Sequence, residues 1–131
     1  MKHPIRILLV DDSPYFLAAA RDFLRLQADF DVVGVAGESQ GMLAQIAEET
    51  PDVILLDLNV GDRSGLDLIP LIKSTAPGAK IIVLTVMEEE PYRDAALHAG
   101  ADAFVRKTEM SRKLISVIAE LSDHDNSTSQ R

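Results

Sequence analysis

Cysteine is absent from the 131-residue chain. Its absence excludes disulfide bonds, thiolate-bound metals and cysteine nucleophiles, and it suits a reducing compartment. Long apolar runs are absent too, since none approaches the roughly 20 residues that a membrane-spanning helix needs. The opening residues, MKHP, lead into a short strand rather than into the apolar core of a signal peptide. We therefore expect a cytoplasmic protein with no membrane partner.

Basic residues are scarce relative to acidic ones, at 13 against 21, and the formal net charge is −8. Because binding to a nucleic-acid backbone needs clustered lysine and arginine, we expect no direct nucleic-acid contact by this domain. Nucleotide binding is also disfavoured, because GVAGESQG lacks the G-x-G-x-x-G order and no P-loop motif occurs. Hydrophobic residues make up 47% of the chain and charged residues 26%, which is typical of one globular domain with a real core.

Short apolar runs of strand length alternate with helical patterns along the chain. Strands are predicted at residues 5–10, 31–37, 53–57, 80–85 and 103–105, and helices at 14–27, 40–50, 66–75, 91–99 and 109–121. Ser13 and Ser39 are predicted to cap the first two helices. Strands that are apolar on both faces and alternate with helices indicate a parallel sheet covered on both sides. The predicted fold is α/β: a doubly wound five-stranded parallel sheet of order 2-1-3-4-5, flanked by five helices and flavodoxin-like.

The predicted domain covers residues 1–122. No internal repeat is evident, and no linker-like stretch interrupts the chain before Ser122. Residues 123–131 are polar and lack an apolar stripe, and we interpret them as a frayed tail or the start of a linker.

Polar residues stand where the predicted strands end. Asp11 and Asp12 follow the first strand, Asp57 ends the third, Thr85 ends the fourth, and Lys107 follows the fifth. In doubly wound sheets, ligands bind beyond the carboxyl ends of the strands, where the strand order reverses. Any one of these aspartates could simply cap a helix or a turn. Because all of these residues share one edge of the sheet, we favour a functional site.

The predicted cluster of carboxylates needs a counter-charge. Two carboxylates about 4 Å apart repel by about 4 kcal/mol at an effective dielectric constant of 20. Lys107 supplies one positive charge against the three negative charges of Asp11, Asp12 and Asp57, and the remainder matches one divalent cation. With oxygen ligands only, and too few of them to wrap Ca²⁺, the predicted ion is Mg²⁺.

The motifs that carry these residues resemble the receiver domain of two-component response regulators, over about residues 5–121. LLVDDSP is similar to the family's acidic pair, LLDLNVGDRSGLDL to its phosphoacceptor strand and loop, IIVLT to its hydroxyl position, and AGADAFVRK to its aromatic and lysine positions. The resemblance implies that Asp57 accepts a phosphoryl group. It also implies that Mg²⁺ is held by Asp57 together with Asp11, Asp12 and the backbone carbonyl of Asn59.

The resemblance further implies a switch rather than an enzyme. Thr85 and Lys107 would bind phosphoryl oxygens, and the ring of Phe104 would follow the Thr85 hydroxyl inward, although Phe104 could also be a plain core aromatic. The surface of the fourth helix, fifth strand and fifth helix would then change. The implied partner is a sensor histidine kinase or phosphotransfer protein, with a homodimer as an option. The chain would be a stand-alone receiver or the N-terminal part of a longer regulator with an output domain, for example one that binds DNA.

Three positions depart from the family's usual pattern. Gly61 stands where proline is common in the loop after the acceptor, and it frees backbone that proline would fix. Val86 follows the threonine, where alanine or glycine is usual, and we expect its bulk to slow phosphoryl entry. Thr108 follows the lysine, where proline is typical, so the preceding peptide bond is either strained or trans. The placement of Lys107 is therefore an open point.

Two other functions remain under consideration. A pseudo-receiver would keep the fold and act as an interaction or dimerisation module without phosphate, and the three departures favour it. A Mg²⁺-dependent phosphatase of the haloacid dehalogenase type is the other option, because LLDLNV superficially matches the apolar strand followed by Asp-x-Asp of that class. Asn59 argues against the phosphatase, because that class uses a second carboxylate there as acid and base.

Overall fold

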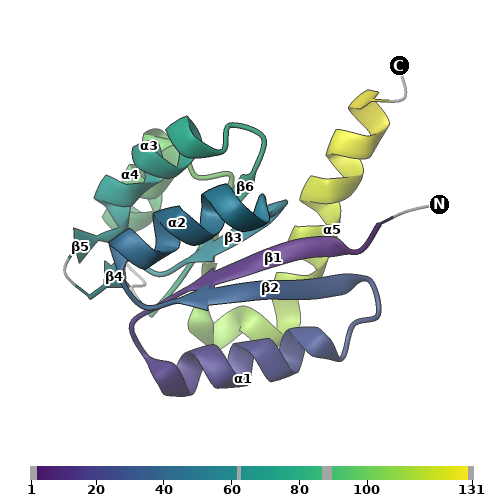
Figure 1. Cartoon of the computed structure of the whole chain (residues 1–131), viewed down its shortest axis with the longest axis horizontal. Helices are drawn as coiled ribbons and strands as arrows, with labels where there is room; N and C mark the ends of the chain where they lie inside the picture. The colour runs from purple at the N-terminus through teal and green to yellow at the C-terminus, as the bar shows by residue number, and fades with distance from the viewer. Residues whose placement is uncertain (1–2, 62, 87–89, 130–131) are drawn as a thin grey trace.

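The computed structural model describes residues 3–61, 63–86 and 90–129, with side chains described up to residue 122. A parallel sheet lies between two layers of helices (Figure 1). The main-sheet strands are β1 (Ile5–Val10), β2 (Phe30–Ala36), β3 (Val53–Leu56), β6 (Lys80–Thr85) and β7 (Ala103–Arg106). The α-helices are α1 (Pro14–Arg25), α2 (Ser39–Glu49), α3 (Gly65–Thr75), α4 (Glu90–Ala99) and α5 (Met110–Ser129). The predicted α/β, flavodoxin-like class is confirmed.

The strand order of the five-stranded sheet is β2-β1-β3-β6-β7. This is the predicted 2-1-3-4-5 order, because β4 (Asn59–Val60) and β5 (Arg63–Ser64) form a separate antiparallel pair. This short ribbon was not among the strands predicted from the sequence. Strand β1 pairs with β2 on one side and with β3 on the other, so the chain reverses its direction of winding between β1 and β3.

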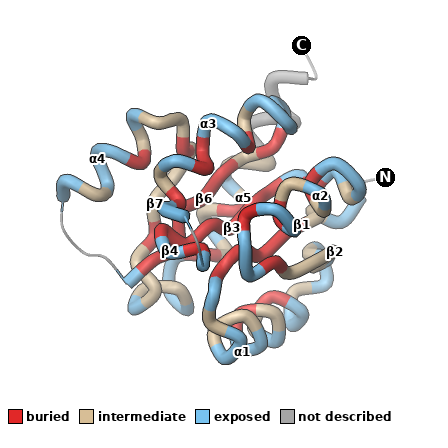
Figure 2. The backbone as a smooth tube through the Cα atoms, turned by 60° about the vertical axis from the view of Figure 1, so that its left-hand side comes forward, coloured by how far each residue is buried: buried red, intermediate tan, exposed pale blue. Residues whose placement is uncertain are grey.

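Both faces of the sheet are buried against helices, as the doubly apolar strands predicted. Toward α2, α3 and α4 the strands contribute alternate aliphatic side chains: Leu8, Val10, Ile54, Leu56, Ile81 and Val83. Toward α1 and α5 they contribute the intervening ones: Ile7, Leu9, Val53, Leu55, Ile82 and Leu84. Figure 2 shows the sheet as the buried centre and the outer helix turns as exposed. Two apolar layers therefore hold the strand ends in fixed positions.

The helix starts follow local capping chemistry. Ser13 caps α1 as predicted: its Oγ accepts from the Phe16 N–H, and Pro14 occupies the first turn. The prediction that Ser39 caps α2 is wrong, because the Glu38 carbonyl accepts the first helical bond, from the Met42 N–H (3.1 Å). Glu38 is therefore the cap residue, although its side chain makes no capping bond.

The C-terminal helix is longer than predicted. A 3₁₀ turn, η1 (Lys107–Glu109), precedes α5, which runs to Ser129 instead of ending near residue 121. The polar segment 123–129, which we interpreted as a tail or linker, is thus helical. Extending an already nucleated helix needs no apolar stripe, because each added residue gains a backbone hydrogen bond. The domain boundary at residue 122 stays a prediction. Across the part of the chain that the structure describes, none of the helices has the length and apolar character of a membrane span.

Candidate functional site

Three carboxylates meet at the carboxyl ends of β1 and β3. Val10 pairs with Leu56 in the register of these neighbouring strands, so the residues that follow, Asp11 and Asp57, emerge side by side. The Asp57 N–H continues the pairing by donating to the Val10 carbonyl (2.9 Å). Carboxylate oxygens of Asp11, Asp12 and Asp57 lie within 4.8 Å of one another. The structure therefore brings together the predicted acidic trio.

The three carboxylates of this trio differ in their exposure to solvent. Asp11 is 2% exposed and Asp57 is 5% exposed, whereas Asp12 is exposed. One oxygen of each buried carboxylate is held by a backbone N–H: Asp11 Oδ1 accepts from Ser13 (2.8 Å) and Asp57 Oδ1 from Leu58 (2.8 Å). The second oxygens of Asp11 and Asp57 face the middle of the site.

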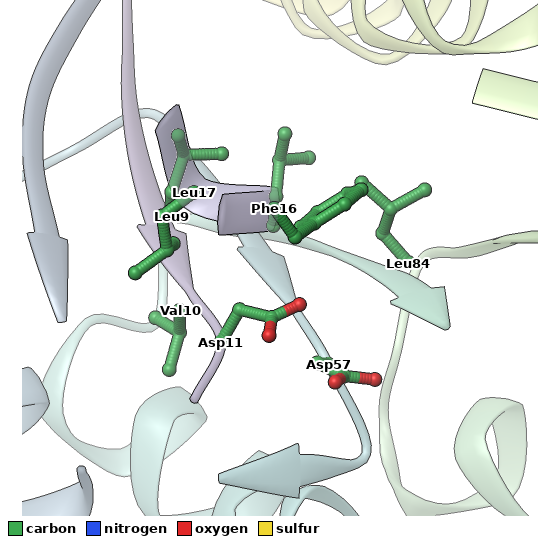
Figure 3. A pocket seen from close by; sticks show the side chains of 8 residues that line it. Leu9, Val10, Asp11, Phe16, Leu17, Asp57 and Leu84 are labelled. Atoms are coloured by element: carbon green, nitrogen blue, oxygen red, sulfur yellow. The ribbon is translucent and has the colours of Figure 1, made fainter. Parts of the chain in front are cut away.

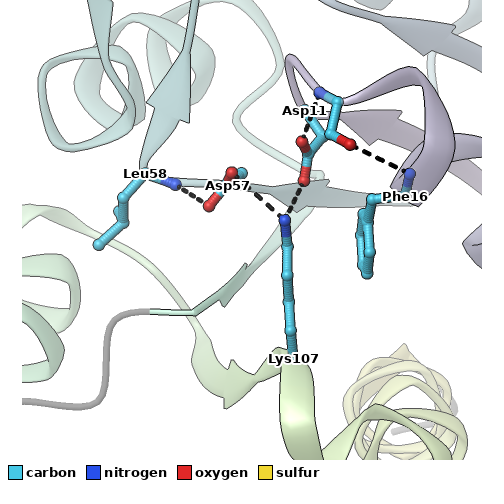
Figure 4. Close-up of polar contacts among 6 residues, drawn as sticks. Asp11, Phe16, Asp57, Leu58 and Lys107 are labelled. Atoms are coloured by element: carbon cyan, nitrogen blue, oxygen red, sulfur yellow. Dashed lines mark hydrogen bonds and ion pairs between the residues drawn. The ribbon is translucent and has the colours of Figure 1, made fainter.

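Lys107 lies between the two buried carboxylates (Figure 4). Its Nζ is 2.6 Å from Asp11 Oδ2 and 3.5 Å from Asp57 Oδ2, and its side chain is only 14% exposed. Among the described residues no peptide bond is cis, so the bond before Thr108 is trans. The Lys107 side chain therefore reaches the acidic site although the following residue is not proline and the peptide bond between them is not cis.

Burial raises the pKa of Asp11 above its ordinary value, because desolvation outweighs the opposing effects of Lys107 and of the Ser13 N–H. The negative charge of Asp57 adds to the increase. The buried Oδ2 of Asp11 accepts no well-aligned hydrogen bond from the described residues. Among these residues, its negative charge is balanced by the ion pair with Lys107. An additional cation beside Asp11 would therefore stabilise the ionised form of its carboxylate.

The donor set fits Mg²⁺. All three side chains offer hard carboxylate oxygens, and one ammonium leaves two of the three negative charges uncompensated. Asn59, the predicted carbonyl ligand, lies two residues after Asp57 at the start of the β4–β5 ribbon. Gly61, in the same ribbon, has φ +53°, which the proline ring forbids. This departure from the family pattern therefore follows from the shape of the loop.

A close backbone approach fixes the main chain of Asp57. Gly65, the first residue of α3, donates its N–H to the Leu58 carbonyl (2.7 Å). A Cβ atom at position 65 would overlap the Asp57 carbonyl oxygen and approach the Leu58 Cα to 2.8 Å. Only glycine fits here without moving the strand that carries Asp57.

Thr85 and Val86 lie at the end of β6, the strand beside β3. Thr85 is fully buried, whereas Val86 is 61% exposed. The threonine therefore belongs to the packed interior of the predicted site, and the valine to its solvent-facing rim. The predicted contact of Thr85 with phosphoryl oxygens stays a prediction, as does the effect of Val86.

Phe104 lies on β7, opposite Val83 of β6, and packs partly exposed against the core under α2, α3 and α4. It also lines a cleft of about 250 Å³ whose other walls are charged: Glu90, Arg93, Arg106, Glu109 and Lys113. Hydrogen bonds and ion pairs from basic side chains hold the pKa of Glu109 below its ordinary value. Both predicted interpretations of Phe104, core aromatic and switch residue, are compatible with this position.

Phe16 is a residue that the sequence analysis did not place in the site. Its ring packs against the apolar cluster between the sheet and helices α1 and α5, near Leu84 (Figure 3). The centroid of the ring also lies 3.9 Å from Lys107 Nζ, within cation–π distance. The sequence signal for this contact was an aromatic residue shortly after the acidic pair. This signal was not sufficient, because Lys107, which the ring contacts, is 91 positions away in the chain.

Comparison with known families and proteins gives concordant results. The family model described as "Response regulator receiver domain" matches residues 7–119. An uncharacterized transcriptional regulatory protein of Bacillus subtilis, YxjL, is 33% identical over 117 residues, which cover 89% of this chain and 54% of that protein. The response regulator protein VraR of Staphylococcus aureus is 32% identical over 120 residues, covering 90% of this chain and 56% of VraR. The chain thus spans a little over half the length of these relatives.

Solved structures match the fold over most of both chains. The response regulator domain of Thermotoga maritima CheB has a TM-score of 0.83 at 26% identity, covering 90% of this chain and 96% of that one. A CheY-like receiver domain protein from Methanospirillum hungatei has a TM-score of 0.86 at 28% identity, with 95% and 98% covered. The isolated REC domain of RcsB from Salmonella enterica, determined with phosphomimetic BeF3-, has a TM-score of 0.84 at 27% identity, with 92% and 90% covered.

Proposed function

The chain belongs to the response regulator receiver domain family, and from this premise we propose that it is a switch controlled by phosphorylation of Asp57. The observation that carries the proposal is the position of the Asp57 carboxylate. It is 5% exposed, held at one oxygen by the Leu58 N–H, and faced at the other by the Lys107 ammonium. A buried carboxylate with one fixed oxygen and an adjacent cation is suited to attack phosphorus.

In the proposed reaction, Asp57 Oδ2 attacks the phosphorus of a phosphohistidine carried by a sensor kinase or a phosphotransfer protein. An O–P bond to Asp57 forms, the P–N bond to the imidazole breaks, and the leaving nitrogen retains the bonding electron pair and takes up a proton. The protein's task is mainly to position the groups and to neutralise charge on the transferred phosphoryl oxygens. Lys107 is close enough to Asp57 Oδ2, at 3.5 Å, to contribute a positive charge there.

We propose that Mg²⁺ is held by the carboxylates of Asp11, Asp12 and Asp57 and by the backbone carbonyl of Asn59. When bound, this ion supplies positive charge that stabilises the phosphoryl oxygens. Thr85, at the end of the strand next to β3, is the proposed donor to another of these oxygens. In this proposal, Mg²⁺ and Thr85 stabilise different oxygens of the phosphoryl group on Asp57.

The proposed output of the switch is a change in the surface of α4, β7 and α5. Phosphorylation favours whichever of two packing arrangements binds the phosphoryl group better, so the change needs only a pre-existing alternative state. Phe104 is the proposed moving element, since it lies at the border between the core and the charged cleft. A homodimer is one proposed consequence. The name of YxjL, a transcriptional regulatory protein, supports an output domain that acts on DNA in a longer protein.

Intact-mass measurement after incubation with acetyl phosphate and Mg²⁺ tests the proposal. We expect an adduct of about 80 Da on the wild-type protein and none on Asp57→Asn. Asp67→Asn is the matched control, because Asp67 is an exposed carboxylate in the first turn of α3 and is not a member of the acidic trio. It should be modified like the wild type.

Three results would overturn the proposal. An adduct that persists in Asp57→Asn would place the acceptor elsewhere. No adduct and no NMR change on titration with beryllofluoride and Mg²⁺ would favour the pseudo-receiver. Repeated turnover of a phosphomonoester would favour the phosphatase.

A further inference from the structure

A closed series of contacts joins the start of α1 to the end of β7. The Ser13 N–H donates to Asp11 Oδ1 (2.8 Å), and Ser13 Oγ accepts from the Phe16 N–H (3.2 Å). The Phe16 ring lies 3.9 Å from Lys107 Nζ, and Lys107 Nζ returns to Asp11 Oδ2 at 2.6 Å. The N-terminal cap of α1 thus holds two groups that contact the Lys107 ammonium, the Asp11 carboxylate and the Phe16 ring.

The Phe16 ring is well placed to restrain a cation. It stands in the first turn of α1 and lines an apolar recess beside Leu9, Leu55 and Leu84, with Asp11 and Asp57 at its polar side. The ring is partly buried and packs against the apolar cluster between the sheet and helices α1 and α5. Lys107 is only 14% exposed, and cation–π attraction is strongest where the cation has lost most of its water.

The two carboxylates do not restrain Lys107 equally. The ammonium lies nearer to Asp11 (2.6 Å) than to Asp57 (3.5 Å), and Asp11 is a proposed Mg²⁺ ligand. A cation held by Asp11 would compensate the carboxylate charge that attracts Lys107, and it would also repel the ammonium. The Phe16 ring carries no charge and is not a metal ligand, so metal binding at the acidic trio would leave its contact with Lys107 in place.

We propose that Phe16 is the positioning residue for Lys107 and keeps its ammonium at the phosphoryl site when Mg²⁺ occupies the acidic trio. This inference rests on the proposed phosphorylation of Asp57. Lys107 is the first residue of the 3₁₀ turn that follows β7, so its long side chain extends from the edge of the sheet to the acidic trio. The aromatic ring supplies from α1 a restraint on the far end of the lysine side chain.

Phe16→Leu and Phe16→Tyr test this role, with Phe23→Leu as the matched control. Phe16 and Phe23 both belong to α1 and pack, partly buried, against the same apolar cluster, but the ring contact with Lys107 is made by Phe16. Beryllofluoride binding in saturating Mg²⁺ is the functional measurement. We expect roughly tenfold weaker binding for Phe16→Leu, from the loss of a desolvated cation–π contact. Phe16→Tyr and Phe23→Leu should bind like the wild type.

A spectroscopic measurement on the Mg²⁺-saturated wild-type protein separates positioning from general stability. The ε-methylene protons of Lys107, assigned with Lys107→Arg, should be shifted upfield by the ring current of Phe16, and Phe16→Leu should abolish the shift. An unshifted Lys107 signal in the wild type overturns the inference, as does unchanged beryllofluoride affinity in Phe16→Leu. If the wild-type protein binds no beryllofluoride, the phosphorylation proposal fails, and the inference fails with it, even if the ring-current shift is present.

Discussion

Replacing Lys107 with methionine should destabilise the metal-free protein by at least about 3 kcal/mol. At an effective dielectric constant of 20, the ammonium attracts Asp11 at 2.6 Å by about 6 kcal/mol and Asp57 at 3.5 Å by about 5 kcal/mol. The two carboxylates, within 4.8 Å of each other, repel by about 3.5 kcal/mol or more. Hydration of the same charges in the unfolded chain cancels much of this attraction, and breaking a buried pair typically costs about 3 to 5 kcal/mol.

Urea denaturation followed by circular dichroism in EDTA measures this loss. Methionine retains the long apolar side chain and its contact with the Phe16 ring, so the change reports mainly on the charge. Adding Asp11→Asn to Lys107→Met should recover most of the lost free energy of unfolding, because the uncompensated buried carboxylate is then gone. We expect a coupling energy of about 2 to 3 kcal/mol between the two changes. Mg²⁺ at about 100 times its Kd should add about 2.7 kcal/mol to the single variant.

Two results would refute this reasoning. A loss below about 1 kcal/mol in Lys107→Met would mean that water or side-chain movement already neutralises the carboxylates, as at an exposed ion pair. Strict additivity of the two substitutions would mean that Lys107 and Asp11 do not interact in solution.

Three further outcomes follow from the described contacts. Because burial raises the pKa of Asp11, this group adds stability to the metal-free protein below its ordinary value of 3.8, and that stability is lost as the pH rises through the raised pKa. The stability of the wild type relative to Asp11→Asn in EDTA should therefore fall over this window, while Mg²⁺ affinity measured by calorimetry should rise, since protons compete with the metal. Ser13→Ala removes the cap of α1 and should cost about 1 kcal/mol in urea denaturation, whereas Ser13→Asp should retain most of the stability. Val86→Ala should speed phosphorylation by acetyl phosphate, and an unchanged rate constant would show that this exposed side chain does not limit entry.

The sequence was sufficient to predict the sheet because its signals are local. Both faces of the strands are apolar, so each strand stands out as a continuous run, and Leu56 and Asp57 illustrate how sharply such a run ends. The predicted meeting of Asp11 and Asp57 required only that the first and third strands be neighbours. Parallel strands place their carboxyl ends at one edge of the sheet. The general rule that ligands bind at this edge in doubly wound sheets was therefore enough to predict where the acidic trio lies.

The features that the sequence did not predict depend on contacts between distant segments or on very short elements. Strands β4 and β5 have two residues each, too few to show an alternating pattern. The Glu38 cap of α2 uses a backbone carbonyl, which every residue has. The place of Phe16 beside Lys107 arises only when α1 packs on the sheet whose edge strand, β7, leads into Lys107. Side-chain type alone could not distinguish this ring from an ordinary core aromatic.

The glycine at position 65 makes Asp57, the proposed acceptor, sensitive to a change that alters no charge and no polar group. Alanine there would press on the carbonyl of Asp57 and the Cα of Leu58, and the carboxylate would tilt relative to the amine that faces it. A methyl group could thus silence the protein while every reactive atom is still present. Loss of signalling in a natural or engineered variant of this chain can therefore originate in steric crowding behind the acceptor, a cause that a survey of its charged residues would overlook.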